Sequence, residues 1–208
     1  MLDKHAGIET GGGDMKSQRS QLRNLTGFAS GVAALFSLTF GASAQVRIVA
    51  LGDSGIRGKG VSDSQAYPGQ LEAALKARGH QVVVTNQGVN GDTTAGVLAR
   101  LDSAVPTGTQ IVVLSIGVND RVLRHLPEAY IAGNKQLIVQ RLRAKGAEVY
   151  VLDKMQQGGL LERADLHVES IRSPANTEWH LNAAGYAIVV GRTLPAVEAL
   201  VRKVEKRR

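Results

Sequence analysis

Four residues have side chains or backbone groups that together could carry out acyl transfer. Ser54, Asn119 and His180 each lie in a short polar stretch, and Gly91 lies in a fourth such stretch. Nucleophilic acyl transfer needs a hydroxyl, an imidazole that takes its proton, and hydrogen-bond donors for the oxyanion that develops. The Ser54 hydroxyl, the His180 ring, the Gly91 backbone N–H and the Asn119 side-chain amide can supply these parts.

Each of these residues also has a simpler structural explanation. A serine after a strand can cap the next helix, and an asparagine or a glycine can serve a turn alone. A single histidine before a helix is more often a surface residue than a base. The four residues favour a functional site only as a set, because they follow one another at the expected ends of successive elements.

The elements that must position these residues are predicted from residue 45 onward, where short apolar runs alternate with segments of helical periodicity. Strands are predicted over residues 46–51, 81–85, 110–116 and 148–152. Helices are predicted over residues 67–78, 93–101, 126–145 and 182–204. This alternation indicates an α/β fold, with a parallel sheet covered by helices on both faces.

The predicted topology places the candidate residues at one edge of the sheet. Polar clusters that contain Ser54, Gly91 and Asn119 follow the first, second and third predicted strands, and His180 lies in the loop that enters the last helix. In an open parallel sheet, ligands bind outside the carboxyl ends of the strands. Between residues 153 and 177 the pattern is irregular and polar, with a short fifth strand predicted over residues 166–171.

The composition excludes several other kinds of site. The chain of 208 residues contains no cysteine, which rules out disulfides, thiolate nucleophiles and cysteine-ligated metals. Aromatic residues make up 4% of the chain, so a surface built on base stacking is not expected. The net charge of +7 can attract anionic partners, but much of it lies in residues 202–208, as is typical of a solvated helix end. We therefore expect no nucleic-acid partner.

Residues 1–44 have the character of a targeting segment. Three basic residues follow Met15, the expected start, and an uncharged, mostly apolar run covers residues 25–40 before Ala42-Ser43-Ala44. This order is typical of a secretory signal peptide cleaved after Ala44. An uncleaved anchor is the alternative, although these 16 residues are short for a bilayer core that needs about 20. We expect a single periplasmic or secreted domain over residues 45–208, without stable membrane insertion.

Four sequence blocks, in order, resemble those of the SGNH hydrolases (GDSL-type esterases and lipases), close to the small secreted bacterial arylesterase and thioesterase branch. The blocks are Ala50-Leu51-Gly52-Asp53-Ser54, Asn90-Gly91-Asp92-Thr93-Thr94, Gly117-Val118-Asn119-Asp120 and His180-Leu181-Asn182-Ala183-Ala184-Gly185. The resemblance implies a single-domain, flavodoxin-like three-layer sandwich with a parallel sheet of about five strands. It also implies that no metal or organic cofactor takes part.

The resemblance assigns a role to each candidate residue. Ser54 is implied as the nucleophile and His180 as the general base. The Ser54 N–H, the Gly91 N–H and the Asn119 side chain are implied as the oxyanion hole. Ser54 does not lie in a G-x-S-x-G turn, and this separates the chain from the α/β-hydrolases.

The chain departs from the family pattern in three places. Gly55 stands where the family usually has leucine, and the interval from Asn119 to His180 is shorter than is usual in the branch. Thr177 stands where the family has an aspartate, three residues before the histidine. The carboxylate that orients the base would then come from Glu178 or Asp165, or a backbone carbonyl would orient the ring of a Ser–His dyad.

The expected function is hydrolysis of carboxylic esters, with thioesters as a further substrate class, through an acyl-enzyme on Ser54. The expected partner is a small-molecule, lipid or acylated ester substrate. Two alternatives remain open. One is O-deacetylation of cell-wall or exopolysaccharide sugars, and the other is a non-catalytic binding protein that has kept the pocket but lost the triad carboxylate.

Overall fold

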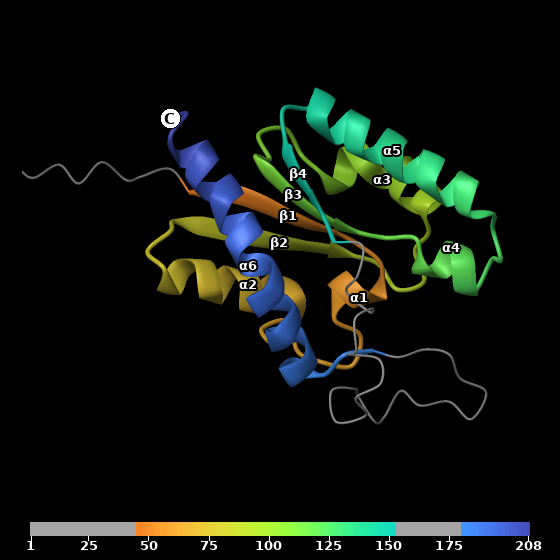
Figure 1. The fold of residues 1–208 in the computed structure, drawn as a ribbon, viewed down its shortest axis with the longest axis horizontal. Coiled ribbons are helices and arrows are strands. Elements are labelled where there is room, and N and C mark those ends of the chain that lie inside the picture. Colours follow the sequence, from red (N-terminus) through yellow and green to blue (C-terminus); the bar gives the residue numbers. More distant parts are fainter. Residues whose placement is uncertain (1–44, 153–179) are drawn as a thin grey trace, which may run out of the picture. The chain divides into compact units, whose positions relative to one another are not determined.

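The core of the fold is a parallel sheet of four strands. The structure, a computed structural model, describes residues 45–152 and 180–208 (Figure 1). Within these ranges the sheet has the order β2-β1-β3-β4, and all neighbouring strands run parallel. The strands are β1 (Val46–Gly52), β2 (Val82–Gly88), β3 (Ile111–Ser115) and β4 (Glu148–Val151). The parallel sheet predicted from the sequence is confirmed, and the fifth strand expected over residues 166–171 lies outside the described residues.

Helices cover both faces of this sheet (Figure 1). One face carries α2 (Tyr67–Ala77) and α6 (Ala183–Glu205), and the other carries α3 (Thr94–Ala104) and α5 (Glu128–Ala144). The central strand β1 serves both layers, because side chains alternate along a strand. Ile48 and Ala50 belong to the apolar core shared with α2 and α6, whereas Val49 and Leu51 belong to the core shared with α3 and α5. The three-layer α/β architecture predicted from the sequence is therefore confirmed.

Most predicted elements occur within a few residues of their predicted bounds, and β2 and α3 each extend three residues beyond their predicted ends. The longer β2 has a clear cause. Its apolar run ends at Thr85, but the strand continues to Gly88, because its backbone remains paired with β1 until Gly52 meets Gly88. Two short helices were not predicted: α1 (Ser54–Arg57) and α4 (Val118–Val122). Helices of one turn are too short to show a hydrophobic period.

The terminal helix α6 is apolar because it is a core element. By length and composition it is the one described helix that could cross a membrane, but half of its most apolar window is buried inside the protein. Its buried valines, such as Val197 and Val201, pack in the same core as Leu71 and Leu75 of α2. Packing against the sheet and α2 thus accounts for its hydropathy.

The far end of α6 is fixed to the start of β2 by an ionic cluster. The His80 ring lies 3.1 Å from a Glu198 carboxylate oxygen through Nε2 and 3.0 Å from Glu205 through Nδ1. Burial opposes protonation of His80, but the hydrogen bonds to the two carboxylates outweigh it and raise the pKa of the imidazole. A protonated ring donates to both partners at once, so this cluster is strongest below the raised pKa.

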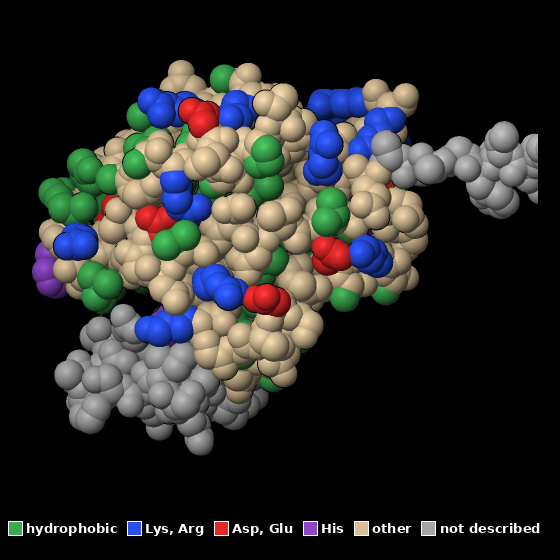
Figure 2. Space-filling view, turned by 180° about the vertical axis from the view of Figure 1, so that it is seen from behind, with side chains coloured by type: hydrophobic (Ala, Val, Ile, Leu, Met, Phe, Trp, Pro, Cys, Tyr) green, Lys and Arg blue, Asp and Glu red, His purple; other side chains and the backbone are tan. Residues whose placement is uncertain are grey.

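Much of the basic surface is paired with carboxylates. Figure 2 shows one face, on which several Lys and Arg side chains lie beside Asp or Glu. Lys145 contacts Asp102 at 2.8 Å, and Glu148 accepts from both Lys203 at 2.7 Å and Arg207 at 2.8 Å. Exposed pairs of this kind contribute little to stability, about 0–1 kcal/mol each.

Candidate active site

Ser54 lies where β1 passes into α1, at the carboxyl edge of the sheet (Figure 1). Asp53 is the N-cap of α1, and its side chain accepts a hydrogen bond of 2.9 Å from the Gly55 N–H. Ser54 is the first residue of the helix, so its backbone N–H has no acceptor within the helix. The sequence Gly52-Asp53-Ser54 therefore forms a sharp strand-to-helix turn that holds the serine at the strand end.

A close approach between strands explains the glycine of this turn. A Cβ at Gly52 would lie 2.0 Å from the backbone carbonyl oxygen of Ser115 on β3. Any larger residue would push β1 away from β3 just before the serine. The glycine thus serves the packing that places Ser54.

His180 directly precedes the N-terminal region of α6 and contacts Ser54. Its Nε2 lies 2.8 Å from the Ser54 Oγ, across 126 residues of sequence, and both side chains are buried. When Nε2 carries no proton, the serine hydroxyl donates to it. Asn182 caps α6 through the Gly185 N–H, and the buried Tyr186 hydroxyl donates to the Gly55 carbonyl oxygen at 2.9 Å. His180 and Tyr186 thus both contact the turn of Ser54 from the start of α6.

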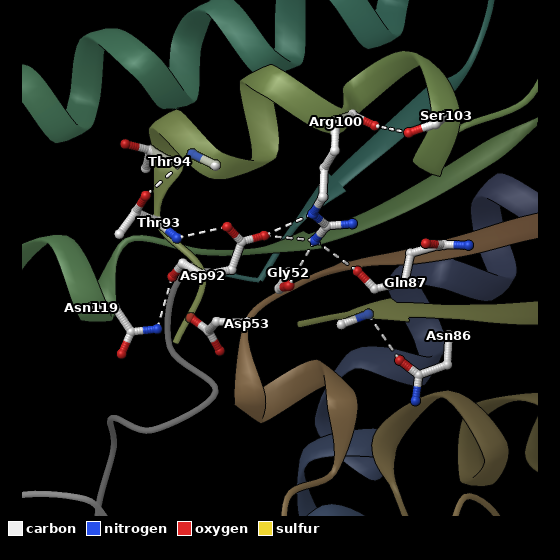
Figure 3. Close-up of polar contacts among 12 residues, drawn as sticks. Gly52, Asp53, Asn86, Gln87, Asp92, Thr93, Thr94, Arg100, Ser103 and Asn119 are labelled. Carbon is white, nitrogen blue, oxygen red and sulfur yellow. Dashed lines mark hydrogen bonds and ion pairs between the residues drawn. The ribbon is translucent and has the colours of Figure 1, made fainter. Parts of the chain in front are cut away.

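Asn119 is linked to the loop of Gly91 through Asp92, the residue that directly follows the glycine. Gly91 has φ 75°, a left-handed conformation that favours glycine, and space beside it is open. Asn119 lies on α4, is buried, and donates from Nδ2 to the Asp92 carbonyl oxygen at 2.8 Å (Figure 3). An amide nitrogen carries two hydrogens, so this bond occupies one donor of Asn119 and leaves a second.

Asp120, the neighbour of Asn119, fixes α4 against the start of α3. Its carboxylate is fully buried and accepts from the Thr94 N–H at 2.9 Å and from the Thr94 hydroxyl at 2.5 Å. Asn134 of α5 donates to the same hydroxyl at 3.0 Å. The start of α3 is thus the common support for the loop of Gly91 and for the helix of Asn119.

Asp53 carries a perturbed carboxyl group beside the candidate nucleophile. Its pKa is raised from 3.8 to about 6, and burial is the largest cause. The hydrogen bond from the Gly55 N–H opposes this rise, and the nearby carboxylates of Asp92 and Asp120 add to it. A folded pKa above the unfolded one means that the native state binds more protons between about pH 4 and pH 6. The cost of ionising Asp53 is absent well below pH 4, is still small at pH 4, and is fully present above pH 6.

We expect Asp53→Asn to stabilise the protein at pH 7 and to have little effect at pH 4. The amide oxygen can still accept from Gly55, whereas the buried charge is lost. A shift of about two pKa units corresponds to an upper limit of about 3 kcal/mol, and a gain of about 1–3 kcal/mol at pH 7 is expected. Urea unfolding of wild type and variant at both pH values measures it.

The matched control for this prediction is Asp63→Asn. The Asp63 side chain is 81% exposed, so no burial cost is removed and no pH-dependent gain should appear. Equal gains of Asp53→Asn at pH 4 and pH 7, or no gain at either, would contradict the assignment of a buried, high-pKa carboxyl group.

The structure brings Ser54 and His180 into contact and links Asn119 to the loop of Gly91. The sequence did not indicate that the Tyr186 hydroxyl binds Gly55. Tyr186 lies on the apolar face of α6 and therefore looks like a core residue. The sequence also did not indicate the contacts of Arg100 and Asp120, whose partners lie on other elements. Glu178 and Asp165, the candidate carboxylates for orienting His180, lie outside the described residues, as does Thr177 at the position of the family's aspartate. Within residues 45–152 and 180–208, no three His, Asp or Glu side chains are grouped as metal ligands.

The family assignment agrees with this geometry. Residues 50–178, more than half of the chain, match the GDSL-like lipase/acylhydrolase family. The chain therefore belongs to this family.

Two curated proteins are similar to part of the chain. Esterase TesA of Pseudomonas aeruginosa is 37% identical over 124 residues, which is 59% of this chain and 61% of TesA. An arylesterase of Vibrio mimicus is 31% identical over 118 residues, 56% of this chain and 58% of that protein. The matches thus span less than two thirds of either relative.

Solved structures share the fold over a larger part of the chain. The psychrotrophic esterase EstA from Pseudoalteromonas sp. has a TM-score of 0.61 at 17% identity, over 76% of this chain and 100% of EstA. A structure of TesA has a TM-score of 0.60 at 24% identity, over 74% of this chain and 99% of that one. At these identities the likeness establishes the fold.

Proposed function

We propose that this chain is a serine hydrolase that cleaves carboxylic esters through an acyl-enzyme on Ser54. The observation that carries the proposal is the contact of 2.8 Å between His180 Nε2 and Ser54 Oγ, two buried groups 126 residues apart. A nucleophile and a base within hydrogen-bond reach are the basic requirement of covalent acyl transfer.

In the first half of the reaction, the Ser54 Oγ attacks the acyl carbon while its proton moves to Nε2 of His180. The carbonyl oxygen becomes an oxyanion as the carbon becomes tetrahedral. The bond to the leaving alcohol then breaks, and the His180 imidazolium returns the proton to that alcohol. The acyl group stays on Ser54 as an ester.

The oxyanion is held by the N–H groups of Ser54 and Gly91 and by the side-chain amide of Asn119. The second hydrogen of the Asn119 amide serves here, since the first donates to the Asp92 carbonyl oxygen. Donors held by the fold before the reaction need little reorganisation when the charge appears.

In the second half, water takes the place of the alcohol. His180 accepts a proton from the water as its oxygen attacks the acyl carbon, and the same donors hold the second oxyanion. Collapse of this intermediate breaks the acyl–Ser54 bond, the proton returns to the Ser54 oxygen, and the free acid leaves. The names of the two curated relatives, an esterase and an arylesterase, support oxygen esters as the main substrates, and thioesters undergo the same steps.

Hydrolysis of short p-nitrophenyl esters by the protein and by its Ser54→Ala variant tests this proposal. Release of p-nitrophenol that depends on Ser54 supports an ester hydrolase. Release of acetate from an acetylated oligosaccharide, with no turnover of the p-nitrophenyl esters, would instead assign the site to sugar O-deacetylation. Binding of an ester without any turnover would make the chain a binding protein.

We also propose that the protein is exported and that its mature form begins at Gln45. The order of basic, apolar and small residues before Gln45 supports this, and β1 begins one residue later at Val46. Expression from Met15 in an export-competent bacterium should place the protein outside the cytoplasm, and N-terminal sequencing should read from Gln45. A membrane fraction that retains the uncleaved N-terminus would contradict cleavage.

A further inference from the structure

Arg100 of α3 connects three backbone segments that surround the candidate active site. Its Nε donates to the Asp92 carboxylate at 2.8 Å, and its Nη2 donates to the carbonyl oxygens of Gly52 at 3.1 Å and Gln87 at 3.0 Å. Figure 3 shows the guanidinium between these acceptors, which come from the ends of β1 and β2 and from the loop before α3. One side chain thus joins elements that are separate in the sequence.

Each acceptor belongs to a segment that the proposed reaction uses. Gly52 lies two residues before Ser54, and its carbonyl oxygen also accepts from the Val89 N–H at 3.0 Å. Asp92 directly follows Gly91, and its backbone carbonyl binds the Asn119 amide. The position of Asp92 therefore affects both the Gly91 N–H and the Asn119 side chain.

The Asp92 carboxylate is held from two sides. One oxygen accepts from Arg100, and the other accepts from the Thr93 N–H at 2.9 Å. The Asp92 side chain is 8% exposed and that of Arg100 is 22% exposed, so the ion pair is shielded from most of the solvent. A planar guanidinium with five N–H donors can satisfy several acceptors at once, which the single ammonium of lysine does less well.

We propose that Arg100 is a positioning residue, which acts through Asp92 to hold the Gly91 N–H and the Asn119 amide at the place where the oxyanion develops. This inference rests on the proposed function, because the oxyanion site is part of that reaction. Its physical basis is that a donor displaced by about 1 Å can cost about 10²-fold in rate.

The first measurement is whether loss of the Arg100 side chain changes kcat or KM. Arg100→Met should lower kcat for a p-nitrophenyl ester by about 10²-fold and leave KM within about threefold of wild type, because oxyanion donors act mainly in the transition state. Arg100→Lys should recover part of this loss. Arg143→Met is the matched control: it removes an arginine from the exposed side of α5 and should keep wild-type kcat.

The second measurement does not depend on activity. The N–H groups of Val89, Asp92 and Thr93 all donate hydrogen bonds within or next to this loop. Hydrogen exchange of the segment 89–94 should be faster in Arg100→Met than in wild type, whereas β4 should exchange equally in both. If Arg100→Met does not fold, Asp92→Asn weakens the same ion pair with nearly the same shape, and a kcat loss of about tenfold with faster exchange is expected.

The two measurements separate the failure of this inference from the failure of the proposed function. Unchanged exchange over residues 89–94, a wild-type kcat in the folded Arg100→Met variant, or a loss that appears only in KM would overturn the role of Arg100. A wild-type protein that shows no ester turnover, and that a fluorophosphonate probe for reactive serines does not label, would overturn the proposed function. In that case, exchange alone decides whether Arg100 holds the loop.

Discussion

The Ser54→Ala variant is expected to lose ester turnover and labelling by a fluorophosphonate probe together. Its side chain ends at Cβ, so no oxygen remains 2.8 Å from His180 Nε2 to attack an acyl carbon or a phosphorus. Loss of a serine nucleophile lowers kcat on the order of 10⁶-fold, and the rate that remains comes from the oxyanion donors and from binding. Initial rates and intact mass after labelling measure the two losses.

The matched control is Ser64→Ala, which removes an exposed hydroxyl that lies 3.1 Å from the Ser62 hydroxyl. This variant should be labelled and should turn over esters as the wild type does. Thermal unfolding should show that Ser54→Ala is folded. Labelling at a different serine, or full turnover by Ser54→Ala, would remove Ser54 from the mechanism.

The Asn119→Ala variant is expected to lose about 10²–10³-fold in kcat, with little change in KM. The reason is that it deletes one fixed donor to the developing oxyanion, which matters mainly in the transition state. Asn119→Asp retains the shape but replaces the amide with a group that repels negative charge, so its loss should be at least as large. Steady-state kinetics on one p-nitrophenyl ester are sufficient for the comparison.

The deletion also removes the hydrogen bond from Asn119 to the Asp92 carbonyl, which costs about 1 kcal/mol of stability. Unfolding measurements separate this cost from the kinetic effect. Gln110→Ala is the matched control, because it removes a side-chain amide that binds Arg47 and Arg208 just before β3, at the opposite end of that strand. If Asn119→Ala keeps wild-type kcat, the residue serves only the turn.

The sequence was sufficient to predict that Ser54 and His180 would meet. Two rules explain this: apolar runs reveal buried strands, and ligands bind at the carboxyl ends of parallel strands. Both rules apply without knowledge of which side chains are in contact in the folded protein. The strands that precede Ser54 and Asn119 could therefore be placed, although no pattern indicated the one-turn helices α1 and α4 that carry the two residues.

The supporting contacts could not be predicted in the same way. Arg100 lies at a helical position that looks solvated in the sequence, but its guanidinium reaches the ends of β1 and β2. Tyr186 looks like an ordinary apolar helix residue, although its hydroxyl binds Gly55. Such contacts depend on the distances between packed elements, which periodicity does not encode. Burial of Asp53, and with it the raised pKa, likewise follows only from the packed structure.

Because α6 is the last element of the chain, the contact between Ser54 and His180 can form only late in synthesis. Ser54 and the loop of Gly91 leave the ribosome early, but His180 follows Ser54 by 126 residues. Asn182, which caps α6, and Tyr186, which binds the Gly55 carbonyl, follow later still. A nascent chain therefore carries Ser54 without its proposed base until translation has passed His180 and the last helix has packed.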